Sequence, residues 1–123
     1  MKPGKTGIRR IINASAYSWQ GFKAAFKHEA AFRQELILCL VLLALLPWVA
    51  SNKLEVLILI LSLFIVLICE IINSAIEAVV DRFGDEIHPL AGRAKDMGSA
   101  AVFLALLNLG VCWSLIFYTN YSL

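Results

Sequence analysis

The stretch VLILILSLFIVLICEIINSAIEAVVDR, at positions 56–82, decides the fold. Its first fourteen residues carry no charge, and Glu70, Asn73, Glu77 and Asp81 follow them. The apolar run is short for a membrane span unless Glu70 lies near the membrane boundary, because a span needs about 17 to 25 residues. The stretch therefore predicts one long helix that crosses a bilayer and ends in a column of polar side chains.

Two further apolar stretches accompany this one. Residues 36–52 lie between Glu35 and Lys53, and residues 97–123 carry no charge. The chain has 123 residues and is only 16% charged, whereas soluble domains are roughly a quarter charged. We predict one all-α integral-membrane domain over residues 1–123, with spans at about 30–50, 54–83 (including a cytosolic extension) and 93–119.

The basic residues predict how the chain is oriented. Ten of the eleven Lys and Arg residues lie within residues 1–35 or 81–96, and Lys53 alone lies in the 51–55 loop. Because cytoplasmic loops carry the excess of Lys and Arg, this side should face the cytosol. We therefore expect a multi-pass membrane protein with its N-terminus in the cytoplasm and its C-terminus outside.

Residues of about 6–27 predict a separate amphipathic helix on the membrane surface. Ile8, Ile12, Trp19, Phe22 and Phe26 fall within about 80° of one another on a helical wheel. A basic amphipathic helix lies in the membrane interface with its aromatic side chains in the acyl boundary. The helix could serve only as an anchor to anionic lipid, or it could form a wall for an amphiphilic substrate.

The polar face at the end of the second span is the candidate site. Glu70, Asn73, Ser74, Glu77 and Asp81 project within about 100° of one another on a helix. Glu70 is fifteen residues from Glu55, about 22 Å along the axis, so it should lie near the inner boundary rather than the midplane. The acids could merely mark where the helix leaves the membrane, but ionisable residues within spans are costly and usually functional.

Other charged residues are predicted at the same depth, at the inner ends of the first and third spans. They are Glu29, Glu35, Lys95 and Asp96. Carboxylates together with substrate phosphates are typical of a magnesium site, although Glu29 could instead pair with Arg33 four residues on. The three cysteines fall within spans, so neither a disulfide framework nor a structural zinc site is expected. The site suits a lipid-modifying enzyme or a small cation-coupled transporter, and its depth favours the enzyme.

Four stretches resemble the bacterial integral-membrane diacylglycerol kinase family. They are RRIINASAYSW at 9–19, HEAAFRQE at 28–35, EIINSAIEAVVDR at 70–82 and GRAKDMGSAAV at 92–102. The resemblance implies a homotrimer in the bacterial inner membrane, with sites shared between subunits, which phosphorylates the hydroxyl of diacylglycerol with MgATP to give phosphatidic acid. A sister branch of the family phosphorylates undecaprenol instead, and the first two stretches are closer to the diacylglycerol branch.

The resemblance also implies roles for individual residues. Glu70 would be the general base and Asn73 would orient the reacting groups, while Glu29 and Glu77 would hold the metal together with ATP. The nucleotide would contact Arg10, Tyr17, Glu29, Glu77, Glu86, His88, Lys95 and Asp96. The lipid would contact Arg10, Ala14, Ser15, Ala16, Tyr17, Ser18, Trp19, Ala31, Phe32, Arg33, Gln34, Glu35, Trp48, Glu70, Ser99, Trp113 and Tyr118.

Overall fold

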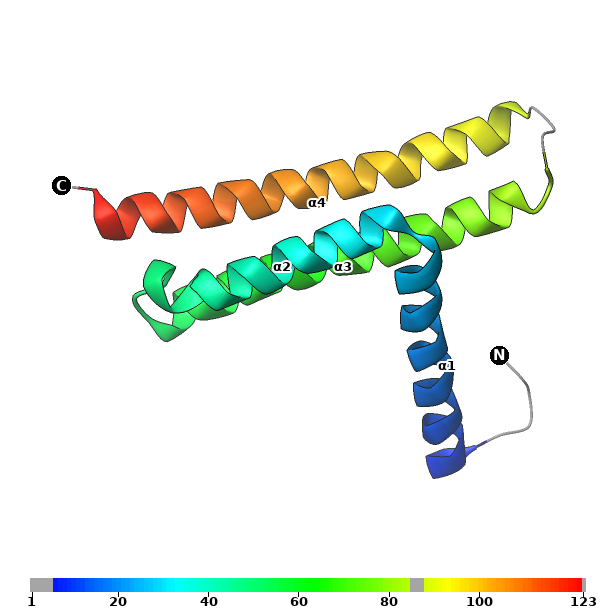
Figure 1. Ribbon diagram of the computed structural model, residues 1–123, viewed down its shortest axis with the longest axis horizontal. Coiled ribbons are helices and arrows are strands. Elements are labelled where there is room, and N and C mark those ends of the chain that lie inside the picture. The colour runs from blue at the N-terminus through cyan, green and yellow to red at the C-terminus, as the bar shows by residue number, and fades with distance from the viewer. Residues whose placement is uncertain (1–5, 85–87, 123) are drawn as a thin grey trace.

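The computed structural model describes residues 6–84 and 88–122, which form four helices (Figure 1). Helix α1 spans Gly7–His28, α2 spans Ala30–Val49, α3 spans Lys53–Asp81 and α4 spans Pro89–Tyr121. Three of them, α2, α3 and α4, are long and apolar enough to cross a membrane. The predicted all-α fold with three candidate spans is therefore confirmed.

The buried core lies where α3 packs against α2 and α4. Leu59 and Val66 of α3 are fully buried, and the same cluster contains Cys39, Leu46, Leu63, Ala105, Leu109 and Trp113. Many other large apolar side chains remain exposed along the three long helices, including Phe64 and Phe103. Such surfaces are stable in contact with lipid or with another apolar helix. The exposed apolar side chains and the apolar composition therefore both favour a membrane protein.

A sharp corner separates α1 from α2, and α1 turns away from the other helices (Figure 1). Glu29 is the corner residue, with an extended backbone at φ −116° and ψ 106°. Arg33 reaches back from α2 and donates from Nη1 to the carbonyl oxygens of Phe26 (2.7 Å) and Lys27 (3.2 Å). These carbonyls belong to the last turn of α1, which lacks partners within its own helix. Arg33 therefore caps α1 rather than forming the helical pair with Glu29 that its spacing had left open.

A polar network joins the chain at the opposite end of the bundle. Asn120 donates from Nδ2 to the carbonyl of Val49 (2.7 Å) and to Oε1 of Glu55 (2.9 Å). Asn52 caps α3 by accepting from the backbone nitrogen of Glu55 at 2.9 Å, and Tyr121 donates from its hydroxyl to the carbonyl of Trp48. The end of α4 is thus fixed to the short connection between α2 and α3.

Helices α3 and α4 form a long antiparallel pair with polar contacts inside it. The indole nitrogen of Trp113 donates to Oγ of Ser62 at 3.0 Å, in the buried part of the bundle. Helix α4 begins at Pro89, four residues before the predicted start of the span, because His88 caps it by accepting from the backbone nitrogen of Leu90 at 3.0 Å. Proline suits this first position because its missing N–H would have no helical partner there.

Candidate active site

The polar face of α3 passes from the buried interior to the exposed end of the helix. Glu70, Asn73 and Ser74 are buried, Glu77 is half-buried and Asp81 is exposed. All of them lie on one side of α3, as the spacing of three and four residues predicts. The structure therefore presents a graded column of polar groups, which begins among apolar side chains and ends in an open surface.

Glu70 is the unusual member of this column. Its side chain is only 3% exposed, and its Oε2 atom is buried without a hydrogen-bond partner in the described part of the chain. Three other carboxylates, those of Glu35, Glu77 and Glu29, lie near enough to repel a negative charge on Glu70. A buried carboxylate without a partner is costly, so the fold keeps this group for something other than packing. This argues against the alternative that Glu70 merely marks where α3 leaves the membrane.

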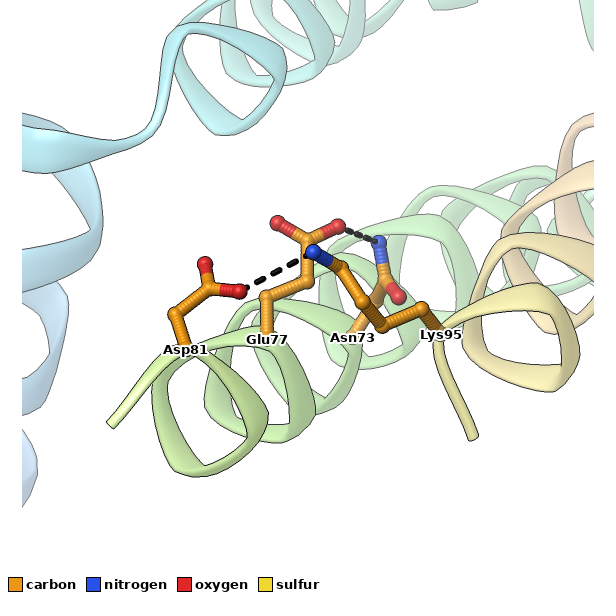
Figure 2. A network of polar contacts seen from close by, with 4 residues as sticks. All are labelled: Asn73, Glu77, Asp81 and Lys95. Atoms are coloured by element: carbon orange, nitrogen blue, oxygen red, sulfur yellow. Dashed lines mark hydrogen bonds and ion pairs between the residues drawn. The ribbon is translucent and has the colours of Figure 1, made fainter. Parts of the chain in front are cut away.

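Two polar contacts connect the rest of the column (Figure 2). Asn73 donates from Nδ2 to Oε1 of Glu77 at 3.2 Å. Lys95 reaches across from α4 and pairs with Oδ1 of Asp81 at 2.9 Å. Figure 2 shows the Glu77 carboxylate between these two contacts. The Lys95 ammonium of α4 thus lies near the Glu77 carboxylate, of which one oxygen accepts a hydrogen bond from within the described chain.

Two clefts lie near this column. An apolar cleft of about 670 Å³ separates α1 from α2 and α3, and a terminal cleft of about 640 Å³ lies between the end of α3 and the start of α4. The apolar cleft is lined by Trp19, Phe22, Lys23, Ala24, Phe26, Lys27, Phe32, Leu36, Leu67 and Ile71. The terminal cleft is lined by Val79, Val80, Asp81, Phe83, Gly84, His88, Leu90, Ala91, Gly92, Ala94 and Lys95.

The two clefts adjoin opposite ends of the polar column. Leu67 and Ile71 of the apolar cleft flank Glu70 on α3, whereas Asp81 and Lys95 of the terminal cleft lie beyond Glu77. One turn of an α-helix advances about 5.4 Å, so Glu70 and Glu77 are about 10 Å apart along the axis. The arrangement can bring an apolar molecule and a polar, charged one together along a single helix face.

Several predicted site residues lie elsewhere in the single chain. Arg10 and Tyr17 are on α1, about 28 Å and 18 Å along that helix from Glu29, since each residue advances 1.5 Å. Trp48 and Tyr118 are exposed near the opposite end of the bundle from Glu70, and Trp113 is buried against Ser62. Glu86 lies outside the described residues. Asp96 and Ser99 are exposed on α4, next in sequence to Lys95 and Gly98.

The lipid-contact residues predicted around the corner are brought together only in part. Phe32 is buried and lines the apolar cleft together with Trp19. Glu35 is half-buried, and its carboxylate lies close to that of Glu70. Ala14 is half-buried, and Ser15, Ala16, Ser18, Ala31 and Gln34 are exposed on α1 or α2. Trp19 and Phe32 are therefore the members of this predicted set that line the apolar cleft.

Sequence reasoning missed three residues that shape the site. Asp81 was ambiguous as a helix-exit acid, but it holds Lys95. Ser62 interrupts the apolar run 56–69 as its one hydroxyl, a signal that could have identified it as the partner of Trp113. Gly98 carries no side chain that a sequence pattern could single out, yet it lies directly against Asn73.

Comparison with known proteins gives a consistent result. The model of a family described as prokaryotic diacylglycerol kinase matches residues 16–117. The chain is similar to the diacylglycerol kinase of Escherichia coli (strain K12), with 46% identity over 122 residues that cover 99% of this chain and 100% of the relative. It is also similar to the diacylglycerol kinases of Haemophilus influenzae (47% over 113 residues, 92% and 96% covered) and Pseudomonas aeruginosa (49% over 113 residues, 92% of each).

Proposed function

The chain belongs to the prokaryotic diacylglycerol kinase family, and from this premise we propose that it transfers the γ-phosphate of ATP to the free hydroxyl of diacylglycerol, at the inner face of the membrane. The observation that carries the proposal is Glu70, a buried carboxylate with one oxygen that has no hydrogen-bond partner among the described residues, whose neighbours Leu67 and Ile71 on α3 line the apolar cleft. A group in this setting can accept a proton from a lipid hydroxyl that approaches from the apolar side.

The apolar cleft suits the acyl chains of the lipid. Its walls are formed by aromatic and aliphatic side chains, with the stems of Lys23 and Lys27 at the edge. Lysine side chains at such positions bury their methylene groups and keep the ammonium near anionic headgroups. A diacylglycerol whose chains lie here would present its hydroxyl close to Leu67 and Ile71, and hence close to Glu70.

The terminal cleft suits the nucleotide. His88 and Lys95 line it, both of which the family resemblance assigns to nucleotide contacts. The ammonium of Lys95, held by Asp81, lies where it can also interact with Glu77 and with phosphate oxygens bound there. Phosphates extending from this cleft toward Glu77 would approach the hydroxyl along the polar face of α3.

The donor set fits magnesium that arrives with ATP. No three His, Cys, Asp or Glu side chains among the described residues are grouped so that they could hold a metal alone. Magnesium is usually held by one or two carboxylates and by substrate phosphates, and among the described residues only one Glu77 oxygen accepts a hydrogen bond. Glu77 and Glu29 would hold the ion, which would offset the negative charge of the transferring phosphoryl group.

The residues around the reacting atoms then have distinct tasks. Glu70 accepts the hydroxyl proton while the hydroxyl oxygen forms a bond to the γ-phosphorus. The bond between that phosphorus and the bridging oxygen breaks, and ADP leaves with the electron pair. Lys95 offsets charge on the phosphoryl oxygens, and Asn73 keeps Glu77 in place. Positioning and electrostatics supply most of the catalysis in such a reaction.

A second copy of the chain would complete the nucleotide site. Arg10 and Tyr17 lie far along α1 from the corner, and α1 points away from the terminal cleft of its own chain (Figure 1). If these residues contact the same nucleotide as Lys95, they must come from a neighbouring subunit. The many exposed apolar side chains on α3 and α4 could be buried in the subunit interfaces of a homotrimer.

Phosphate transfer in detergent micelles tests the proposed function directly. With labelled ATP, magnesium and diacylglycerol, we expect labelled phosphatidic acid to accumulate, and undecaprenol in place of diacylglycerol should give much less product. Greater product with undecaprenol would assign the chain to the sister branch. If phosphate were transferred to neither lipid, the proposed lipid kinase activity would be wrong, and the transporter would become the favoured function.

The proposed inner-face location makes a second prediction, which labelling in intact cells can check. A cysteine at Ser122 should react with an impermeant thiol reagent added from outside, whereas a cysteine at Lys5 should react only after the membrane is opened. The parent protein, whose own cysteines lie in the long apolar helices, is the control. The reverse labelling pattern would place the site on the outer face, where ATP is not supplied.

A further inference from the structure

Gly98 of α4 is buried directly against the side chain of Asn73 on α3. A methyl group at this position would overlap Oδ1 of Asn73 and would lie 3.3 Å from its Cγ and 3.6 Å from Cδ1 of Ile76. A glycine thus lets the two helices approach closely at this level. The space that the missing side chain leaves is filled by the carboxamide of Asn73.

The constraint is specific to this glycine of α4. Gly92 and Gly110 lie on the same helix, and an added Cβ at either position would meet nothing within 4 Å. Gly98 is buried, whereas Gly92 and Gly110 are exposed, so a need for flexibility along all of α4 does not explain it. The atoms that an added methyl group would crowd belong to Asn73, because Ile76 lies at an ordinary contact distance.

The orientation of Asn73 follows from its two neighbours. Its amide nitrogen faces Glu77, as Figure 2 shows, because a carboxylate accepts hydrogen bonds and would repel the amide oxygen. The oxygen must then point away from Glu77, and there it is buried without a hydrogen-bond partner in the described chain. This arrangement requires room beside Oδ1, which only the lack of a side chain at position 98 provides.

We propose that Gly98 is a positioning residue for the magnesium-nucleotide site: it holds the Asn73 carboxamide against Glu77, and so fixes the carboxylate that receives the cation. The inference rests on the proposed function, since it assigns a purpose to the placement of Glu77. Asn73 restrains one oxygen of Glu77 and leaves the other for the metal. Without this restraint, the carboxylate would have to be ordered when the cation binds, which weakens binding.

The substitution Gly98→Ala tests the proposal, with Gly110→Ala as the matched control on the same helix. Displacement of Asn73 removes a hydrogen bond to a charged group, so we expect the magnesium concentration for half-maximal turnover to rise roughly tenfold or more. A binding measurement accompanies it: magnesium with a non-hydrolysable ATP analogue should raise the Tm of the wild type and of Gly110→Ala, but much less that of Gly98→Ala.

A double variant separates positioning from simple helix packing. In Asn73→Ala the carboxamide that would collide is gone, so adding Gly98→Ala should cost little further Tm and little further nucleotide-induced stabilisation. The double variant should also assemble if Gly98→Ala alone does not. Equal losses in both backgrounds, or failure of the double variant to fold, would show that position 98 acts through packing alone and would overturn the proposal.

The remaining outcomes are also decisive. Gly98→Ala with unchanged magnesium dependence and unchanged nucleotide-induced stabilisation would overturn the role of Gly98 and leave the kinase function intact. A wild type that neither transfers phosphate nor gains Tm from magnesium and the analogue would instead overturn the proposed function itself.

Discussion

Replacing Glu70 with glutamine is expected to give a folded protein that is nearly inert. Glutamine has almost the same shape and still forms hydrogen bonds, but it cannot take a proton from the lipid hydroxyl. General base catalysis typically contributes ~10²–10⁴-fold, so turnover in the micelle assay should fall by a factor on that order. The KM values for lipid and ATP should change little, because the loss is confined to the chemical step.

The stability of Glu70→Gln distinguishes a catalytic acid from a structural one. The carboxylate is buried with an unpartnered oxygen, so its neutral replacement should keep or raise Tm. Glu55→Gln is the matched control, because Glu55 lies on the same helix and accepts from Asn120 and Ser51 at the opposite end. That variant should lose Tm and keep turnover. Near-normal turnover in Glu70→Gln would exclude it as the base and make Glu35 or Asp96 the candidate.

Glu77→Gln should produce the second large effect, on magnesium dependence. A hard cation prefers carboxylate oxygen, so removal of the charge should raise the magnesium requirement on the order of 10–100-fold and lower turnover steeply. The glutamine oxygen can still accept from Asn73, so the helix contacts and the assembly should survive. The measurement is turnover against magnesium concentration at saturating ATP. If the dependence of turnover on magnesium were unchanged, Glu77 would not hold the metal and would only mark where α3 leaves the membrane.

The sequence predicted those features that depend on spacing along one helix. The uncharged run 56–69 and the recurrence of Glu70, Asn73, Glu77 and Asp81 predicted a long helix with one polar face, which α3 shows. The predicted depth of Glu70 near a membrane boundary stays a prediction. Periodicity is informative here because the helical repeat is fixed by the backbone.

Contacts between helices could not be predicted in the same way. The four-residue spacing of Glu29 and Arg33 suggested a pair within one helix, but Glu29 is not helical, so the spacing rule does not apply to it. The contacts of Gly98 with Asn73, and of Trp113 with Ser62, join residues 25 and 51 positions apart. Such pairs depend on how two helices face each other, which apolar surfaces in lipid specify only weakly.

The hydrogen bond between Trp113 and Ser62 has a consequence for the distant active site. Three specific contacts join α3 to α4 at successive depths: Ser62 with Trp113, Asn73 with Gly98, and Asp81 with Lys95. A slip of α4 by one helical turn, about 5.4 Å, would break all three at once. The apolar neighbours along the pair could exchange partners with little loss, so the polar contacts set the axial register. The height at which Lys95 stands beside Glu77 is therefore determined partly in the middle of the bundle, several turns from any substrate.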